Sequence, residues 1–331
     1  MDDKRYNVID FAKFIFSIFI IAIHTQPLAN INTEADFVLS NIICRIAIPF
    51  FLVCSGFFMG RKSEYSEEKI IPNKKYIKGQ FIKIFKMYLV WSIVYLLISI
   101  YNWKKIGWFS SVAFIDWGIS FFTKGSYYHL WYLISLLYAI PLVSFIMKTI
   151  KKKYYSILML VLYIAQVIVY AYSFVLPESL SLILKICDYL SCPFIALTRI
   201  LPFLLLGIII SREKNDKNSG IMCLVNLVFL VAEIYLLRSN DQEAFSYVFF
   251  TFPTSYYLFK MVLRIGEIKH IGAHKMFRSS TFVYCVHPIF VWVISEFFEI
   301  ENQWIFIVTV ILSIVTWEIR DAGGSLLLWR K

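Results

Sequence analysis

The sequence predicts an all-α polytopic membrane protein with about ten transmembrane helices and both termini in the cytoplasm. Three observations support this: an excess of apolar residues, apolar runs of bilayer length, and an uneven distribution of lysine and arginine. Of the 331 residues, 59% are hydrophobic and 17% are charged, whereas a soluble domain has about 45–50% apolar and about 25% charged residues. An aromatic share of 18% and a mean hydropathy of +0.68 exclude a disordered chain and argue against a soluble enzyme, a collagen or a coiled coil.

Apolar runs of about 20 residues, the length that crosses a bilayer as a helix, recur along the whole chain. They fall at 7–26, 37–59, 81–101, 129–147, 154–174, 192–211, 220–237, 245–264, 281–299 and 304–319. The segment 103–123 is aromatic but is interrupted by Asp116 and Gly118, which predicts an interfacial helix or a re-entrant piece. We expect one membrane domain over 1–331, without a visible internal repeat.

The positive charge of the chain is concentrated on one side of the predicted membrane. The net charge is +11, and 24 of the 33 lysines and arginines lie in one set of connections. The opposite set holds five, and four lie inside spans. The positive-inside rule therefore places both termini in the cytoplasm, which an even number of spans permits. We expect a multi-pass protein of the cell (plasma or inner) membrane that contacts lipid and binds no nucleic acid, because no soluble basic face is predicted.

The cysteines and the loop histidines do not predict a metal site. Most of the six cysteines lie within apolar runs and none forms a C-x-x-C pair, so neither zinc nor a disulfide framework is expected. Cys187 and Cys192 flank one loop and could form a disulfide, but two free thiols are the simpler interpretation. His270 and His274 are spaced i, i+4 in a cytoplasmic loop, where a solvated surface is favoured without a third ligand.

Charged and polar residues inside the spans are functional candidates, because a charge at bilayer depth is costly. The predicted topology places five such residues from five separate spans toward the outer leaflet: His24, Arg45, His129, Arg199 and Glu233. Each has a structural alternative. His24 could be a core histidine, either arginine could pair with Glu233 to hold helices together, and His129 could belong to an aromatic belt with its tyrosine and tryptophan neighbours. The convergence of all five favours a site.

A second group of residues is predicted toward the cytoplasmic side: Lys13, Lys78, Lys83, Lys86, Lys260 and His287. Lys13 and His24 are 11 residues apart, so both lie on one helix face, about 16 Å apart along the axis. A long anionic donor, with its phosphates inside and its reactive end outside, fits that arrangement. Alternatively, the lysines that enter the third span anchor it at the lipid headgroups.

Several segments carry a resemblance to a known family. They are IDFAK at 9–13 followed by ten residues and His24, CRIAIPFF at 44–51, SGFF at 55–58, YHLWYL at 128–133, the segment 199–207, and YCVHP at 284–288. Together they resemble the acyltransferase family 3 of integral membrane acyltransferases over essentially the whole chain. Lys13 stands where the family has an arginine, so the charge is kept but the planar, bidentate guanidinium is lost.

The resemblance implies a ten-span fold and transfer of an acyl group, commonly acetyl, from cytoplasmic acyl-CoA to a hydroxyl of an extracytoplasmic or lipid-linked glycan. On this interpretation His24 is the general base, and Arg45 or Arg199 stabilises the oxyanion, with His129 in the family's H-L-W segment. Lys13, with Lys83 and Lys86, would bind the phosphates of acetyl-CoA. No metal is expected, and envelope-glycan synthesis proteins are the expected partners.

Two other functions stay open from the sequence. The chain also resembles the membrane half of the serine racemases of vancomycin resistance, for which an amino-acid transport role is proposed. A transporter of a small polar solute would use the same polar cavity without acyl transfer, and broken helices would be expected there. A structural subunit of an envelope assembly would tolerate neutralisation of its paired intramembrane charges. Only the acyltransferase requires His24 and turnover of coenzyme A.

Overall fold

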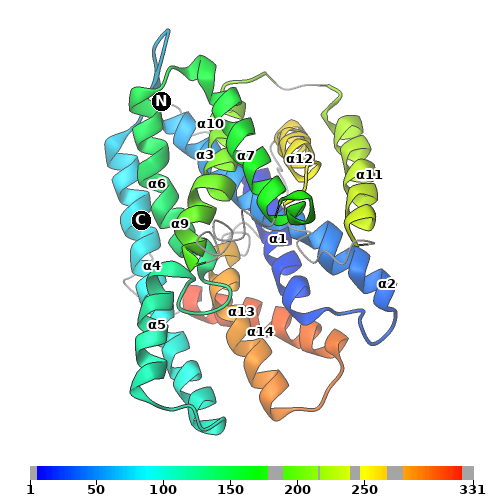
Figure 1. The fold of residues 1–331 in the computed structure, drawn as a ribbon. Helices are drawn as coiled ribbons and strands as arrows, with labels where there is room; N and C mark the ends of the chain where they lie inside the picture. Colours follow the sequence, from blue (N-terminus) through cyan, green and yellow to red (C-terminus); the bar gives the residue numbers. More distant parts are fainter. Residues whose placement is uncertain (1–5, 178–188, 215–216, 239–246, 267–278, 323–331) are drawn as a thin grey trace. The chain divides into compact units, whose positions relative to one another are not determined.

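The computed structural model describes residues 6–177, 189–214, 217–238, 247–266 and 279–322 (Figure 1). Within these ranges, nine helices are long and apolar enough to cross a membrane. They coincide with nine of the ten predicted spans, which confirms an all-α polytopic membrane protein. The chain divides into two compact units, the first formed by Met1–Ser55 and Glu213–Lys331 and the second by Gly56–Arg212.

The first unit is built from the N-terminal and C-terminal helices of the chain. Its elements are α1 (Asn7–Thr25), α2 (Thr33–Asp36), η1 (Phe37–Ile43), η2 (Cys44–Ile46), the first half of α3 (Ala47–Lys62), α11 (Ser219–Arg238), α12 (Thr251–Ile265), α13 (Ser280–Phe297) and α14 (Asn302–Ala322). The helices α13 and α14 pack against α1, and α11 packs along α12 (Figure 1). Phe50 joins α1, α3 and α12 in the core, with ring centroids 4.4 Å from Phe16 and 5.4 Å from Phe259.

The helix α12 occupies the eighth predicted span, 245–264. Its 15 residues rise about 22 Å, which is less than the hydrocarbon thickness of a typical bilayer, about 30 Å. The residues directly before Tyr247 lie outside the described ranges.

The second unit contains the middle of the chain. Its elements are the end of α3, β1 (Glu64–Tyr65), β2 (Ile70–Ile71), α4 (Lys74–Lys105), α5 (Ser111–Thr123), α6 (Trp131–Thr149), η3 (Lys152–Tyr154), α7 (Tyr155–Tyr170), η4 (Ser173–Val175), α9 (Ser191–Ile195), η6 (Ala196–Ile200) and α10 (Leu201–Ile210). The long helix α4 packs on α6, and α7 packs on α10. The segment predicted as an interfacial or re-entrant piece contains α5, a 13-residue apolar helix whose N-cap Ser110 accepts the N–H of Ala113.

Two glycines on α3 let the backbone of α10 approach closely. A methyl group added to Gly56 would overlap the carbonyl of Leu204, and one added to Gly60 would overlap the side chain of Ser211. Glycines four residues apart are a common device for close helix packing in membranes, where the lack of a side chain brings two backbones together. The spacing therefore fixes how α3 and α10 pack in this unit.

The predicted cytoplasmic connection between α3 and α4 is folded as a small hairpin. The strands β1 and β2 pair antiparallel, with Tyr65 opposite Ile70. The hydroxyl of Tyr65 donates to the carbonyl of Ile208 at 3.3 Å, and the guanidinium of Arg212 lies 3.9 Å from the Tyr65 ring centroid. These contacts hold the hairpin against the end of α10.

Candidate active site

His24 lies one residue before the end of α1. The helix ends because the next residue, Gln26, adopts a left-handed conformation (φ 47°), and its N–H bonds the carbonyl of Ala22. No break interrupts α1 between Lys13 and His24, so the prediction that both lie on one helix face is confirmed. The Nζ of Lys13 is 3.2 Å from Asp10 Oδ1, so the two side chains form an ion pair one turn apart on α1, as their i, i+3 spacing permits.

Arg45 lies where the second span departs from α-helical geometry. The span begins with wide π-helical turns, Phe37–Ile43, and continues through the 3-10 turn Cys44–Ile46. Such segments are rare and are often found at functional sites. Arg45 Nη2 donates to Asn41 Oδ1 at 3.1 Å, and its charge lies within electrostatic range of the His24 ring. The structure thus brings together two of the residues predicted to be catalytic.

A second histidine lies beside His24. The rings of His24 and His287 stack with centroids 5.4 Å apart and planes inclined by 25°. The prediction that His287 lies toward the cytoplasm, apart from His24, is therefore wrong. That prediction assumed that every span starts at one membrane depth. His24 is 17 residues from the start of α1 and His287 is seven from the start of α13, so the helix starts are staggered.

A buried carboxylate ties the loop after His24 to the turn that leads to Arg45. Asp36 Oδ1 accepts the N–H of Leu28 at 2.9 Å and the hydroxyl of Ser40 at 3.2 Å. Charge-assisted hydrogen bonds of this kind are stronger than neutral ones. They hold the end of α1 and the beginning of the second span in one arrangement, which fixes the relative positions of His24 and Arg45.

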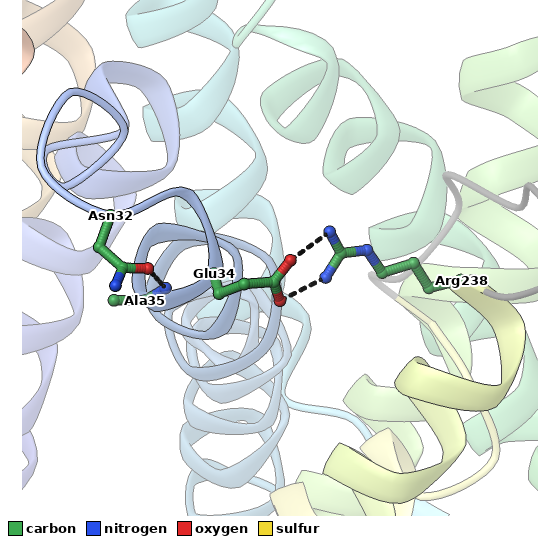
Figure 2. Close-up of polar contacts among 4 residues, drawn as sticks. All are labelled: Asn32, Glu34, Ala35 and Arg238. Atoms are coloured by element: carbon green, nitrogen blue, oxygen red, sulfur yellow. Dashed lines mark hydrogen bonds and ion pairs between the residues drawn. The ribbon is translucent and has the colours of Figure 1, made fainter.

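The same loop is held from α11. Figure 2 shows the carboxylate of Glu34 joined to the guanidinium of Arg238 by two hydrogen bonds, 2.8 and 2.9 Å long. In the same view, the side chain of Asn32 accepts the N–H of Ala35 at 3.0 Å and so caps α2. The guanidinium of Arg238 also lies 4.0 Å from the ring centroid of Phe37. These contacts attach α2 to the C-terminal end of α11.

Glu233 has a role that the sequence did not predict. Its two carboxylate oxygens accept the N–H groups of Phe249 and Phe250 at 2.8 and 2.9 Å, at the start of α12. An anionic group is favoured at a helix N-terminus because the first N–H groups have no partner within the helix. Glu233 thus caps α12, whereas the sequence had suggested an arginine partner.

His129 lies in the second unit among aromatic rings. It is buried, with centroids 4.7 Å from Tyr95, 5.8 Å from Tyr127 and 5.4 Å from Tyr128. Burial raises the pKa of both Tyr127 and Tyr128, so these phenols stay protonated at neutral pH. This setting agrees with the aromatic-belt interpretation, and a catalytic role for His129 stays a prediction.

Arg199, like Arg45, lies in a segment that departs from α-helical geometry, here the π-helical turns Ala196–Ile200. Its guanidinium carbon is 5.2 Å from the ring centroid of Tyr170 and 5.8 Å from that of Trp131, distances at which cations are attracted to aromatic faces. A proline follows each arginine closely, Pro49 and Pro202. Since proline lacks an N–H, it frees a helix carbonyl, and this signal could have located both irregular segments.

The predicted cytoplasmic lysines are in different settings. Lys83 and Lys86, like Lys78, are exposed on α4 in the second unit, so their grouping with Lys13 of the first unit stays a prediction. Lys260 is buried on α12. Its Nζ donates to Glu213 Oε2 and to the Tyr256 hydroxyl, each at 3.0 Å.

Cys187, His270 and His274 lie outside the described residues. The other five cysteines are buried free thiols. In the part of the chain that the structure describes, no three histidine, cysteine or acidic side chains are arranged to hold a metal ion.

Comparison with known proteins gives a family and three distant relatives. The sequence profile described as "Acyltransferase domain" matches residues 6–318. An amino-acid racemase of Enterococcus faecalis is 30% identical over 166 residues, covering 49% of this chain and 21% of that protein. A second from the same organism is 28% identical over 148 residues, 44% of this chain and 20% of that protein. A serine/alanine racemase of Enterococcus gallinarum is 28% identical over 129 residues, 39% of this chain and 18% of that protein.

The chain therefore spans about a fifth of the length of these relatives. No solved structure matches it. The family profile, by contrast, covers nearly the whole chain, and the described residues form nine helices of membrane-spanning length. On these grounds the chain is a multi-pass membrane protein that belongs to the acyltransferase domain family.

Proposed function

We propose that the protein is an O-acyltransferase of the cell membrane that moves an acetyl group from cytoplasmic acetyl-CoA to a hydroxyl of an extracytoplasmic or lipid-linked glycan. The observation that supports it most is the placement of His24 at the end of α1, within electrostatic range of Arg45. Membership of the acyltransferase family supports acyl transfer in general. The donor, the acceptor and the acetyl group are part of the proposal.

In the proposed reaction, the hydroxyl oxygen of the acceptor attacks the thioester carbonyl carbon while His24 takes the hydroxyl proton. The carbonyl oxygen becomes an oxyanion, which a guanidinium stabilises in a site of low dielectric. Collapse of the intermediate breaks the carbon–sulfur bond, and His24 returns the proton to the thiolate. The products are an ester and free coenzyme A. Arg45, whose charge lies within electrostatic range of His24, is the guanidinium proposed for this role. Arg199 and His129, which belong to the second unit, stay proposed catalytic residues.

The proposed donor site runs along α1 toward the cytoplasm. Lys13 lies on the face that carries His24, about 16 Å away along the helix axis. A thioester at the end of an extended pantetheine arm would reach His24 while the phosphates stay near Lys13. Lys83 and Lys86 are proposed to meet the same phosphates. The Asp10–Lys13 pair implies that donor phosphate competes with a carboxylate for the lysine.

The experiment measures acetyl transfer by purified protein carrying His24→Ala, with radiolabelled acetyl-CoA and an acceptor glycan. Loss of a general base is expected to lower turnover about 10²–10⁴-fold, with monodisperse protein recovered in normal yield. Ile23→Ala, which changes the adjacent residue of α1, is the matched control and should keep its activity. Turnover of His24→Ala within about twofold of wild type would overturn the catalytic role.

The same protein separates the proposed function from transport of a small polar solute such as an amino acid. Reconstituted into vesicles, an acyltransferase releases coenzyme A thiol in proportion to ester formed. A transporter accumulates solute, releases no thiol and is indifferent to His24→Ala. Solute uptake without thiol release, under conditions in which the protein is folded, would replace the proposed function with the transporter.

A further inference from the structure

His287, whose ring stacks on that of His24, differs from His24 in burial. His287 is fully buried, whereas His24 keeps part of its surface exposed. The two rings lie nearly parallel, 25° apart in orientation, with centroids separated by 5.4 Å, and α1 packs along α13 at this point. His287 therefore forms a wall against one face of the His24 ring.

The sequence around His287 fixes which of its nitrogens carries the proton. Its Nδ1 is 3.0 Å from the carbonyl oxygen of Val283, one helical turn earlier. A carbonyl only accepts hydrogen bonds, so Nδ1 is the donor. Pro288, the next residue, has no N–H to give to the carbonyl of Tyr284, and that carbonyl also interacts with the His287 ring. His287 is thus held as a neutral imidazole with its proton on Nδ1.

Only one of the two stacked rings can take a further proton at reasonable cost. A proton on the buried His287 would create a charge without water to solvate it. It would also lie beside the ring that receives the proton of the reaction, and like charges repel strongly in a site of low dielectric. His24, which is partly exposed, is the ring that can become charged.

From these contacts we infer that His287 is a positioning residue for His24. It holds the His24 ring in one plane, so that the ring nitrogen points to the reacting hydroxyl, and it leaves His24 as the imidazole that takes the proton. The inference rests on the proposed function, because it assigns His287 a part in the reaction of which His24 is the base. An error of about 1 Å in the placement of a reacting group can lower turnover about 10²-fold.

The kinetic test compares three variants of the purified full-length protein. His287→Ala removes the wall and is expected to lower kcat about 10²-fold while the KM for acetyl-CoA changes little. His287→Phe keeps a flat ring of similar size and should recover most of the lost kcat. Val286→Ala, a truncation of the adjacent buried side chain, is the matched control for loss of packing and should keep its kcat per folded molecule. A phenylalanine variant no better than the alanine variant, or equal losses in the alanine variant and the control, would overturn the inference.

A spectroscopic measurement separates failure of this inference from failure of the proposed function. The chain has five histidines, and their ¹⁵N signals can be assigned by single substitutions in labelled protein. His287 is expected to give the signals of a neutral ring protonated on Nδ1, and His287→Ala should shift the signals of His24 more than His287→Phe does. An Nε2-protonated His287, or His24 signals unmoved by the alanine change, would refute the positioning role even if acyl transfer is intact. Absence of acyl transfer in the wild type would refute the proposed function instead.

Discussion

Gly56 of α3 packs its α-carbon directly against the backbone carbonyl of Leu204 on α10. One turn further along α3, Gly60 faces the side chain of Ser211 in the same way. No side chain longer than hydrogen fits between α3 and α10 at Gly56, and the obstruction is backbone rather than a flexible side chain. The packing of these two helices in the second unit thus depends on the two glycines.

We expect Gly56→Ala to destabilise the protein by about 1–3 kcal/mol, the range for overpacking a close contact. Thermal unfolding in detergent, followed by size-exclusion chromatography of the heated sample, measures the effect. Gly79→Ala on α4 is the matched control, because nothing lies within 4 Å of an added methyl group there. That change should be neutral or should stabilise by up to about 1 kcal/mol, the helix preference of alanine over glycine. Equal behaviour of the two variants would contradict the packing described here.

Glu233→Gln should destabilise the start of α12. The amide keeps one oxygen acceptor but presents an NH₂ group to the second backbone N–H, so one part-buried donor loses its partner. The cost is at most the value for a buried donor, about 1–3 kcal/mol. The favourable interaction of a carboxylate with the helix N-terminus is lost as well. Glu299→Gln, which changes an exposed glutamate, is the control for the loss of charge alone. A melting temperature lowered equally in both variants would argue against the capping role of Glu233.

Lys13 can be tested for donor binding against a purely structural role. If it binds donor phosphate, Lys13→Met should weaken acetyl-CoA binding much more than it lowers thermal stability, and Lys13→Arg should keep or strengthen binding because guanidinium adds bidentate bonds. If it only neutralises Asp10, Lys13→Met should destabilise the protein, and the double variant with Asp10→Asn should restore stability. Calorimetric affinity and thermal unfolding of the single and double variants decide between these outcomes.

The hairpin between α3 and α4 should face the cytoplasm, as the cation asymmetry predicts. In a cysteine-free background, a cysteine at Ser66 should resist an impermeant thiol reagent added to intact cells and react after the cells are opened. A cysteine at Lys124, an exposed position after α5, should react from outside in intact cells. Labelling of the Ser66 cysteine from outside would reverse the predicted orientation and the assignment of donor and acceptor sides.

Several features of the candidate site followed from sequence patterns alone. The Asp10–Lys13 pair and the shared face of Lys13 and His24 depend only on helical periodicity along α1, and the structure confirms both. The neighbourhood of Arg45 and His24 was expected from their predicted depth, and their electrostatic contact agrees with it. Short-range geometry and the separation of residues along one helix can be worked out from spacing, because an α-helix has a fixed rise and rotation per residue.

Other features could not be derived in this way. The sequence did not predict that the carboxylate of Glu233 caps α12. His287 was placed away from His24, yet their rings stack. Neither feature could be predicted, because depth along a span gives no information about which helix packs beside which, or about how far one helix is staggered against another.

The sequence by itself determined the fold class, the positions of the spans and the chemistry available inside the membrane. This was possible because a membrane-spanning helix must be apolar over about 20 residues, and an unpaired charge inside it is costly. Both conditions can be checked one segment at a time in the sequence. Only the tertiary structure decided that His287 lies against His24, that Gly56 meets the Leu204 carbonyl, and that Arg45 lies in a 3-10 turn and Arg199 in π-helical turns. These relationships depend on close packing between segments that are distant in the sequence. Such packing is determined jointly by all of the side chains that are in contact.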